Sequence, residues 1–469
     1  MIKTKKLLSL LTSTFLLITI CAAAPSHKSP AMTETQEIED ESPTEEPANI
    51  VFVKELQKYL DNDDIKGAIS LFDKLPEELS SDLGLKSLQA SLLYSDKEFT
   101  KAISVSKEIL KENPKDMETL ELLALCYKGK GDTKSYKEIS DKILKEDPYN
   151  PTINIEKANE FVLSKKWKQA RSYYGNALRG DGNNTEAMFG YAKMSYYLDD
   201  LQTAEKYLNK IISIDPYNAE ALAYKGTIEF DKENYLLASD YVSQAIRIDP
   251  YNKYYWLDYG KYLQYQGKLD DAIKAWEKAI EIDPTYFLAY GNIASVYDER
   301  GEFDKALENY RKVIETNPDY FYAYETAAIL EYHAGNYKNA INYFQKAYEY
   351  NPSYSYSLMT AACYFKLNDS FHAKKILEAQ MKKLNRQSTE YDLVRFFHDS
   401  YSRNAESTLL RKIEKTENSN DRGKMYYYMG LYNEIYGSDV IAKEFYSKVI
   451  GMKAPMFFEY RLAEWGMEE

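Results

Sequence analysis

A pattern of small residues, large residues and residues that end helices repeats along this chain at a fixed interval. This interval is the number of residues from Pro250 to Pro284. Each period can be counted from the residue 31 positions before a proline, and its eighth and twentieth positions are alanine or glycine in most copies. The twenty-fourth position is usually large, as in Phe72, Tyr174 and Trp276. A large side chain facing small ones fills a layer between two helices without voids. The pattern therefore predicts two antiparallel helices per period, each of roughly 12–14 residues.

Prolines and glycines mark the ends of these helices. The prolines follow one another at one period or, where one is missing, at two, and proline ends a helix because it lacks an N–H and clashes with the preceding turn. Glycines at the fifteenth position favour left-handed backbone between the two helices of a period. The phase gives twelve frames over residues 49–456, starting at 49, 83, 117, 151, 185, 219, 253, 287, 321, 355, 389 and 423. Residues 457–469 are expected to form a C-terminal capping helix.

Residues 1–24 have the pattern of an export signal. Three lysines among the first six residues precede an apolar run that ends at Ala24, which is the order of a secretory signal peptide. The alanines at 22–24 offer cleavage by the ordinary signal peptidase. Cys21 offers lipid attachment instead, although Ile20 departs from the small residue that precedes a lipoprotein cysteine. A retained membrane anchor is the third alternative.

Residues 25–48 are expected to be a disordered, acidic linker rich in proline, serine, threonine and glutamate. They carry a net charge of −6, which leaves −10 over residues 49–469 of a chain with 45 tyrosines. An acidic body is a poor binder of nucleic acid and of anionic lipid. Because residues 1–24 have the pattern of an export signal, the chain is expected to be exported, either to the periplasm or to an envelope membrane. It is expected to contact that membrane only through a lipid at Cys21.

The repeating frame resembles the tetratricopeptide repeat, which has about 34 residues and a W-x2-L-G-x2-Y, A-x3-F, P pattern. Frame 117–150 departs from the pattern at Tyr136 and Ser140, and frame 389–422 is degenerate, with Phe396 in a small position. The resemblance implies an all-α fold, a right-handed superhelical solenoid of about 11–12 helix-turn-helix units. Frame 253–286 matches best, through Trp256, Tyr259, Gly260, Ala272, Trp276, Ala279 and Pro284.

By the same resemblance, the first helices of the repeats line a concave groove that binds partners. Positions two, five, nine, twelve and thirteen of each frame would face this groove. Aromatic residues interleaved with a few charges are typical of a surface that binds an extended peptide. The candidate partner-binding residues are Phe189, Lys193, Tyr196, Tyr197, Tyr254, Lys261, Tyr265, Tyr322 and Tyr332.

The residues that carry catalysis or bind metals in proteins do not form a recognisable pattern here. The sequence has no H-E-x-x-H or G-x-S-x-G motif, and its four histidines lack neighbours suited to a metal site. Cys126 and Cys363 lie seven frames apart and are not expected to pair. Cys126 is expected to be a small core residue, whereas Cys363, at position nine, could reach the groove. No cofactor, metal site or catalytic residue is therefore predicted.

The functional hypothesis is a non-enzymatic scaffold of the bacterial cell envelope that binds a protein or peptide in the groove. The alternative hypothesis is a module that binds a glycan such as peptidoglycan, because tyrosine rings can stack on sugars. A nucleic-acid partner is not expected.

Overall fold

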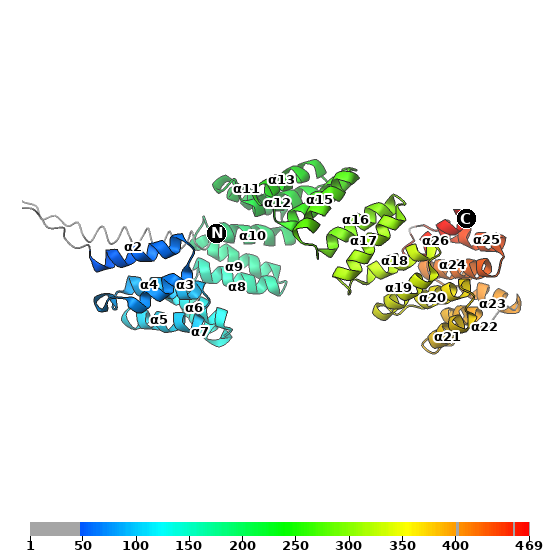
Figure 1. Ribbon diagram of the computed structural model, residues 1–469, viewed down its shortest axis with the longest axis horizontal. Helices are drawn as coiled ribbons and strands as arrows, with labels where there is room; N and C mark the ends of the chain where they lie inside the picture. Colours follow the sequence, from blue (N-terminus) through cyan, green and yellow to red (C-terminus); the bar gives the residue numbers. More distant parts are fainter. Residues whose placement is uncertain (1–46, 400–402, 454, 469) are drawn as a thin grey trace, which may run out of the picture. The chain divides into compact units, whose positions relative to one another are not determined.

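The computed structural model describes residues 47–399, 403–453 and 455–468. Throughout these ranges the regular elements are helices, which confirms the all-α fold class (Figure 1). The expected signal segment 1–24 with Cys21, and the linker as far as residue 46, lie outside the described residues. Contacts within the chain divide it into two compact units, one up to Ile211 and one from Ile212. None of the described helices is long and apolar enough to cross a membrane.

The first unit consists of consecutive helix pairs. Its first helices begin within one residue of the frame starts counted from the prolines. The exception to the expected helix length is α3, which ends at Leu71 and is followed by 3₁₀ turns at Phe72–Lys74 and Glu77–Leu79. Pro76 explains the early end, since it cannot donate a helical hydrogen bond. The helices are α2 Ala48–Asp61, α3 Ile65–Leu71, α4 Leu83–Ser95, α5 Phe99–Glu112, α6 Met117–Lys130, α7 Thr133–Glu146, α8 Pro151–Leu163, α9 Trp167–Gly180, α10 Thr185–Tyr197 and α11 Leu201–Ile214.

The second unit continues the same pairing to the end of the described chain. Its last complete pair departs from the phase, because α24 begins at Ser419, four residues before the expected start at 423. The helices are α12 Ala219–Asp231, α13 Tyr235–Ile248, α14 Lys253–Tyr265, α15 Leu269–Ile282, α16 Phe287–Glu299, α17 Phe303–Thr316, α18 Phe321–His333, α19 Tyr337–Tyr350, α20 Tyr354–Lys366, α21 Ser370–Met381, α22 Thr389–Asp399, α23 Arg403–Glu414, α24 Ser419–Ile435, α25 Asp439–Ile450 and α26 Glu459–Glu468.

The core consists of the small and large positions that define the period. The alanines at positions eight and twenty, such as Ala294 and Ala306, are fully buried. Trp276 at position twenty-four is also fully buried, and a Cβ added to Gly260 would clash with its indole ring. The indole nitrogen of Trp276 donates a hydrogen bond to the Leu257 carbonyl over 3.1 Å. The steric complementarity expected from the sequence is therefore what joins the two helices of this pair.

The sequence Asp-Pro-Tyr-Asn, which recurs at residues 147–150, 215–218 and 249–252, forms the connection between repeats. The Asp215 carboxylate accepts a hydrogen bond from the Tyr217 N–H over 3.0 Å, and the Asn218 side chain accepts one from the Ala221 N–H over 2.9 Å. The asparagine thus caps the next first helix, whose opening N–H groups would otherwise have no partner. The proline of the connection marks the end of the preceding helix, as at Pro284, where α15 ends two residues earlier at Ile282.

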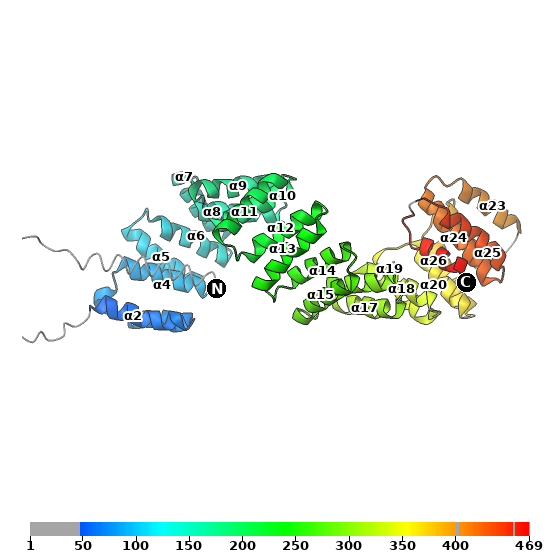
Figure 2. The same ribbon diagram turned by 90° about the horizontal axis from the view of Figure 1, so that it is seen from above.

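The C-terminal helices of the second unit fold back onto earlier repeats. In Figures 1 and 2, α24 and α26 lie beside α18 and α20, and contacts join α24 to α20 and α26 to α18. In a regular repeat stack each repeat touches only its neighbours. The expected capping helix is present at Glu459–Glu468, but it packs on first helices far from it in the sequence as well as on α25.

Candidate functional site

The first helices of both units carry exposed tyrosines at the positions expected to face a partner. Their exposed fractions are large for aromatic residues on rigid helices: 46% for Tyr197, 59% for Tyr254, 54% for Tyr265 and 57% for Tyr322. We call the surface formed by positions two, five, nine, twelve and thirteen of the frames the first-helix face. Exposed rings on a preformed surface are typical of protein-binding sites.

In the first unit, the candidate residues lie along α10, and its two tyrosines form a ring cluster at the end of the helix. The ring of Tyr197 stacks on that of Trp167, with 4.9 Å between the ring centroids, and the Tyr196 ring lies 5.6 Å from it edge to face. Phe189 and Lys193, on the same helix, are half-buried. Trp167 was not among the expected site residues, and it fixes the orientation of one that was.

In the second unit, a cluster around Phe230 brings two candidate residues together. The Lys261 ammonium lies 4.0 Å from the centroid of the Phe230 ring, and the Tyr265 ring meets that ring edge to face at 4.9 Å. The Tyr235 ring contacts both of these rings, at 5.4 Å from Phe230 and 5.2 Å from Tyr265. A cation above an aromatic face is attracted by the ring quadrupole, so Lys261 is held where its charge is available next to Tyr265. Tyr254 lies apart from this cluster, against Tyr286 at 5.8 Å.

Tyr322 lines a pocket between the first helices α16 and α18. The pocket has a volume of about 280 Å³ and includes Leu288, Gly291 and Ser295, which occupy positions two, five and nine of their frame. Leu288 is 40% exposed. Gly291 adds no side chain to the pocket, although a Cβ there would fit, at 3.8 Å from the Val313 side chain. The pocket is thus a preformed depression beside an exposed tyrosine, lined by both apolar and polar side chains.

The other edge of the first-helix face at α16 and α18 is occupied by α26. The Arg461 guanidinium forms two hydrogen bonds with the Asp298 carboxylate, over 2.7 and 2.6 Å. The Trp465 ring stacks on His333 at 4.0 Å, and Arg461 lies 4.3 Å above the Trp465 ring. Asp298 and His333 occupy positions twelve and thirteen of their frames. A helix of this chain therefore binds where a partner protein or peptide was expected.

The fold-back covers two residues expected at the groove, one in part and one wholly. Tyr332 does not present its hydroxyl to a partner: this hydroxyl is buried without a hydrogen bond, and burial raises its pKa well above the ordinary value. Cys363 is fully buried rather than exposed in the groove. Both residues face α24, where Tyr427 packs in the same core. The period identified their positions correctly, but it contains no information about a helix that returns from a distant part of the chain.

Comparison with known proteins agrees with the repeat assignment. Tetratricopeptide-repeat models match residues 155–219, 287–320 and 323–354, and a TPR-repeat model matches residues 260–299. The chain contains tetratricopeptide repeats. None of the curated proteins that were compared matches the sequence.

Solved structures of tetratricopeptide-repeat proteins are similar to parts of the chain. MamA shares 25% identity, covering 34% of this chain and 94% of its own, with a TM-score of 0.32. YrrB, described as a TPR protein with an unusual peptide-binding site, shares 23% identity, covering 39% of this chain and 95% of its own, with a TM-score of 0.32.

A further aromatic position of the repeats was missed in the sequence. Position seventeen, at the start of the second helix, is aromatic in several repeats and packs on position twelve or thirteen of its own or the next repeat. This gives pairs that recur: Tyr94–Phe99, Trp167–Tyr197, Phe230–Tyr235, Tyr235–Tyr265, Phe303–His333 and Tyr332–Tyr337. The signal was present in the sequence, since these aromatics follow one another at one or two whole periods.

The described residues contain no cluster of three metal-binding side chains. Cys126 and Cys363 are free and buried. Burial raises the pKa of the Cys126 thiol to about 12 and that of Cys363 also above its ordinary value. A thiol that stays protonated at neutral pH is a poor nucleophile, so neither cysteine is suited to covalent catalysis.

Proposed function

We propose that this protein is a non-enzymatic scaffold that binds a protein or peptide on the first-helix face of its tetratricopeptide repeats. The observation that carries the proposal is the docking of α26, which binds this face through Arg461 on Asp298 and Trp465 on His333. A face that accommodates one amphipathic helix has the shape and chemistry to accommodate another. Tyr254, Tyr265 and Tyr322 lie on the part of the face that remains exposed.

The test is photo-crosslinking in the cells that make the protein. A photoreactive amino acid in place of Leu288, beside Tyr322 in the pocket, should capture a protein. Tyr254→Ala combined with Tyr322→Ala should abolish this capture, since truncating a buried aromatic contact often costs over about 2 kcal/mol of binding free energy. The control is Tyr251→Ala, because Tyr251 is 81% exposed in the connection before α14.

Unchanged capture by the double variant would contradict binding at the first-helix face. Capture of peptidoglycan fragments in place of protein would favour the glycan alternative, which no observation on the described residues supports. Helix content measured by circular dichroism should be the same in all variants, because the two tyrosines are exposed.

We also propose that the protein acts in the cell envelope after export. The support is the order of lysines and then apolar residues in segment 1–24. Sequencing the N-terminus of the protein purified from its cells should find a mature chain that starts between Cys21 and Pro25. Cys21→Ser should block processing if the cysteine carries a lipid, and should leave it complete if the ordinary signal peptidase acts. A cytoplasmic chain that retains residues 1–20 would contradict export.

A further inference from the structure

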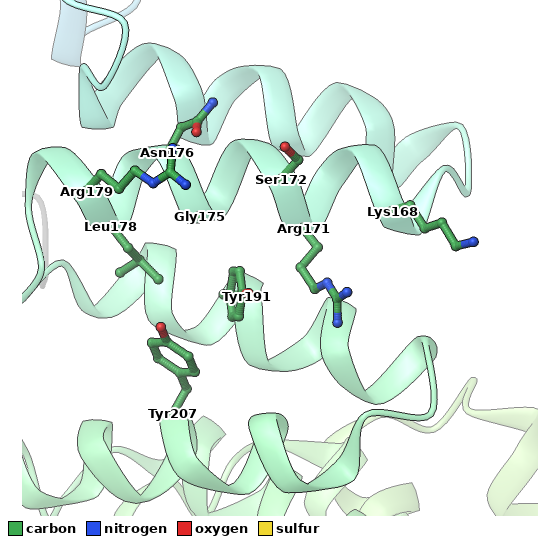
Figure 3. Close-up of a pocket in the computed structure, with 9 residues that line it drawn as sticks. All are labelled: Lys168, Arg171, Ser172, Gly175, Asn176, Leu178, Arg179, Tyr191 and Tyr207. Atoms are coloured by element: carbon green, nitrogen blue, oxygen red, sulfur yellow. The ribbon is translucent and has the colours of Figure 1, made fainter.

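A second cleft lies in the first unit, on the side of the second helices. It has a volume of about 520 Å³ and is formed by α9, α10 and α11 (Figure 3). Figure 3 shows Arg171 and Leu178 projecting from α9 toward α11, Tyr207 projecting from α11 toward α9, and Tyr191 between them. We call it the basic cleft. It is lined by Lys168, Arg171, Ser172, Gly175, Asn176, Leu178, Arg179, Tyr191 and Tyr207.

The charge of the basic cleft is opposite to that of the chain. Residues 164–180, which include α9, contain five lysines and arginines and no carboxylate, in a protein with a net charge of −13. Arg171 pairs with Asp200 over 3.1 Å. Arg179 instead lies 5.4 Å from the centroid of the Tyr149 ring, and among the described residues neither Arg179 nor Lys168 pairs with a carboxylate. The cleft thus retains positive charge that its surroundings do not neutralise.

The other residues of the cleft add directional contacts. Tyr191 and Tyr207 lie 4.9 Å apart and form an aromatic wall, and Asn176 and Ser172 contribute polar groups. Gly175 keeps the cleft clear in front of that wall, since a Cβ there would lie 3.2 Å from the Tyr191 ring. Guanidinium groups bind carboxylates through two parallel hydrogen bonds. Donors on one side and rings on the other suit a peptide that combines acidic and aromatic residues.

From these features we infer that the basic cleft is a second binding surface, which takes an acidic segment of a partner protein. Its volume holds only a few side chains, and a long polyanion such as nucleic acid would meet repulsion from the acidic body around it. A short run of carboxylates beside one aromatic residue matches both the size and the charge. The surface is separate from the first-helix face, so its occupation does not depend on the proposed function.

The test is binding of a fluorescent peptide with four glutamates around one phenylalanine, measured by anisotropy with the full chain at low salt. Lys168→Gln combined with Arg179→Gln should weaken binding at least tenfold, and raising the ionic strength should weaken wild-type binding too, because salt screens the attraction. Lys142→Gln combined with Lys145→Gln is the matched control, since it removes two charges from the second helix α7 and should leave binding unchanged. A peptide with glutamine in place of glutamate should bind at least tenfold more weakly.

Three results would overturn the inference: no binding to the wild-type chain, equal binding by the glutamine peptide, or equal loss in the control variant. A short DNA duplex or a vesicle of anionic lipid that binds more tightly than the peptide, and is lost in the cleft variant, would overturn it too and assign the cleft to phosphate. If the double variant loses helix content, peptide binding is measured with Arg179→Lys instead. This substitution keeps the charge but removes the bidentate geometry, so it should weaken binding of the peptide. Since Tyr254 and Tyr322 are not involved, this test can fail while binding at the first-helix face persists.

Discussion

Six residues other than glycine adopt left-handed backbone in the described chain, each in the turn between the two helices of a repeat. Lys97 has a φ of 64° and Glu233 also 64°, while Gly131 and Gly267 occupy the same turn with φ of 81° and 76°. A side chain with a Cβ is strained by about 1–2 kcal/mol in this region. The repeats therefore keep the turn geometry even where the sequence does not supply the residue that favours it.

Replacing one of these residues with glycine should stabilise the protein. Lys97→Gly should raise the free energy of unfolding by about 0.5–1 kcal/mol, since relief of strain exceeds the entropy that glycine adds to the unfolded chain. Asp96→Gly, one residue earlier at a φ of −81°, should lower it by a similar amount. Urea unfolding followed by circular dichroism measures both. A lower stability of Lys97→Gly would show that the turn is not strained.

The single-residue properties that the sequence predicted are those determined within one helix pair. Positions eight and twenty had to be small because the twenty-fourth is large, and Gly260, Ala272 and Trp276 of one pair are buried accordingly. Exposure on the first-helix face depends also on what covers it. Tyr254 and Tyr322, at position two, are exposed as expected, whereas Tyr332, at position twelve, is half-buried and its hydroxyl lies buried near Tyr427 of α24.

At the scale of elements, the helix limits followed the frame because proline, asparagine caps and turn residues act locally. α12 and α16 begin at residues 219 and 287, the starts counted from the prolines. The placement of α26 was not predictable in this way. Its docking depends on Arg461 meeting Asp298 from 163 residues away, and the repeat period describes only contacts between neighbouring repeats. The presence of α26 was expected, but its partner helices were not.

Across the second unit, the fold-back of α26 changes how the repeats are coupled. In an open array the terminal repeat has one neighbour and frays first. Here the last helix contacts α18 as well as α25, and its Glu459 side chain is fully buried, where it accepts a hydrogen bond from the Tyr428 hydroxyl over 2.9 Å. Opening the C-terminus therefore requires breaking contacts to helices in the middle of the unit.

Hydrogen exchange should reveal this coupling as slow exchange at the C-terminal end. Amides of α26 in the wild-type chain should exchange about as slowly as those of α18, despite the short length of the helix. Arg461→Ala should accelerate exchange in α26 roughly tenfold or more. The substitution leaves the Asp298 carboxylate, which is 14% exposed, without its charged partner. Hydrogen bonds to charged groups contribute about 1.5–3 kcal/mol to stability. Arg411→Ala on the exposed side of α23 is the control and should leave α26 unchanged, and neither variant should alter exchange in α4–α7 of the first unit. Fast exchange of α26 in the wild-type chain would mean that the helix is detached from the first-helix face much of the time, and that this part of the face is open to a partner after all.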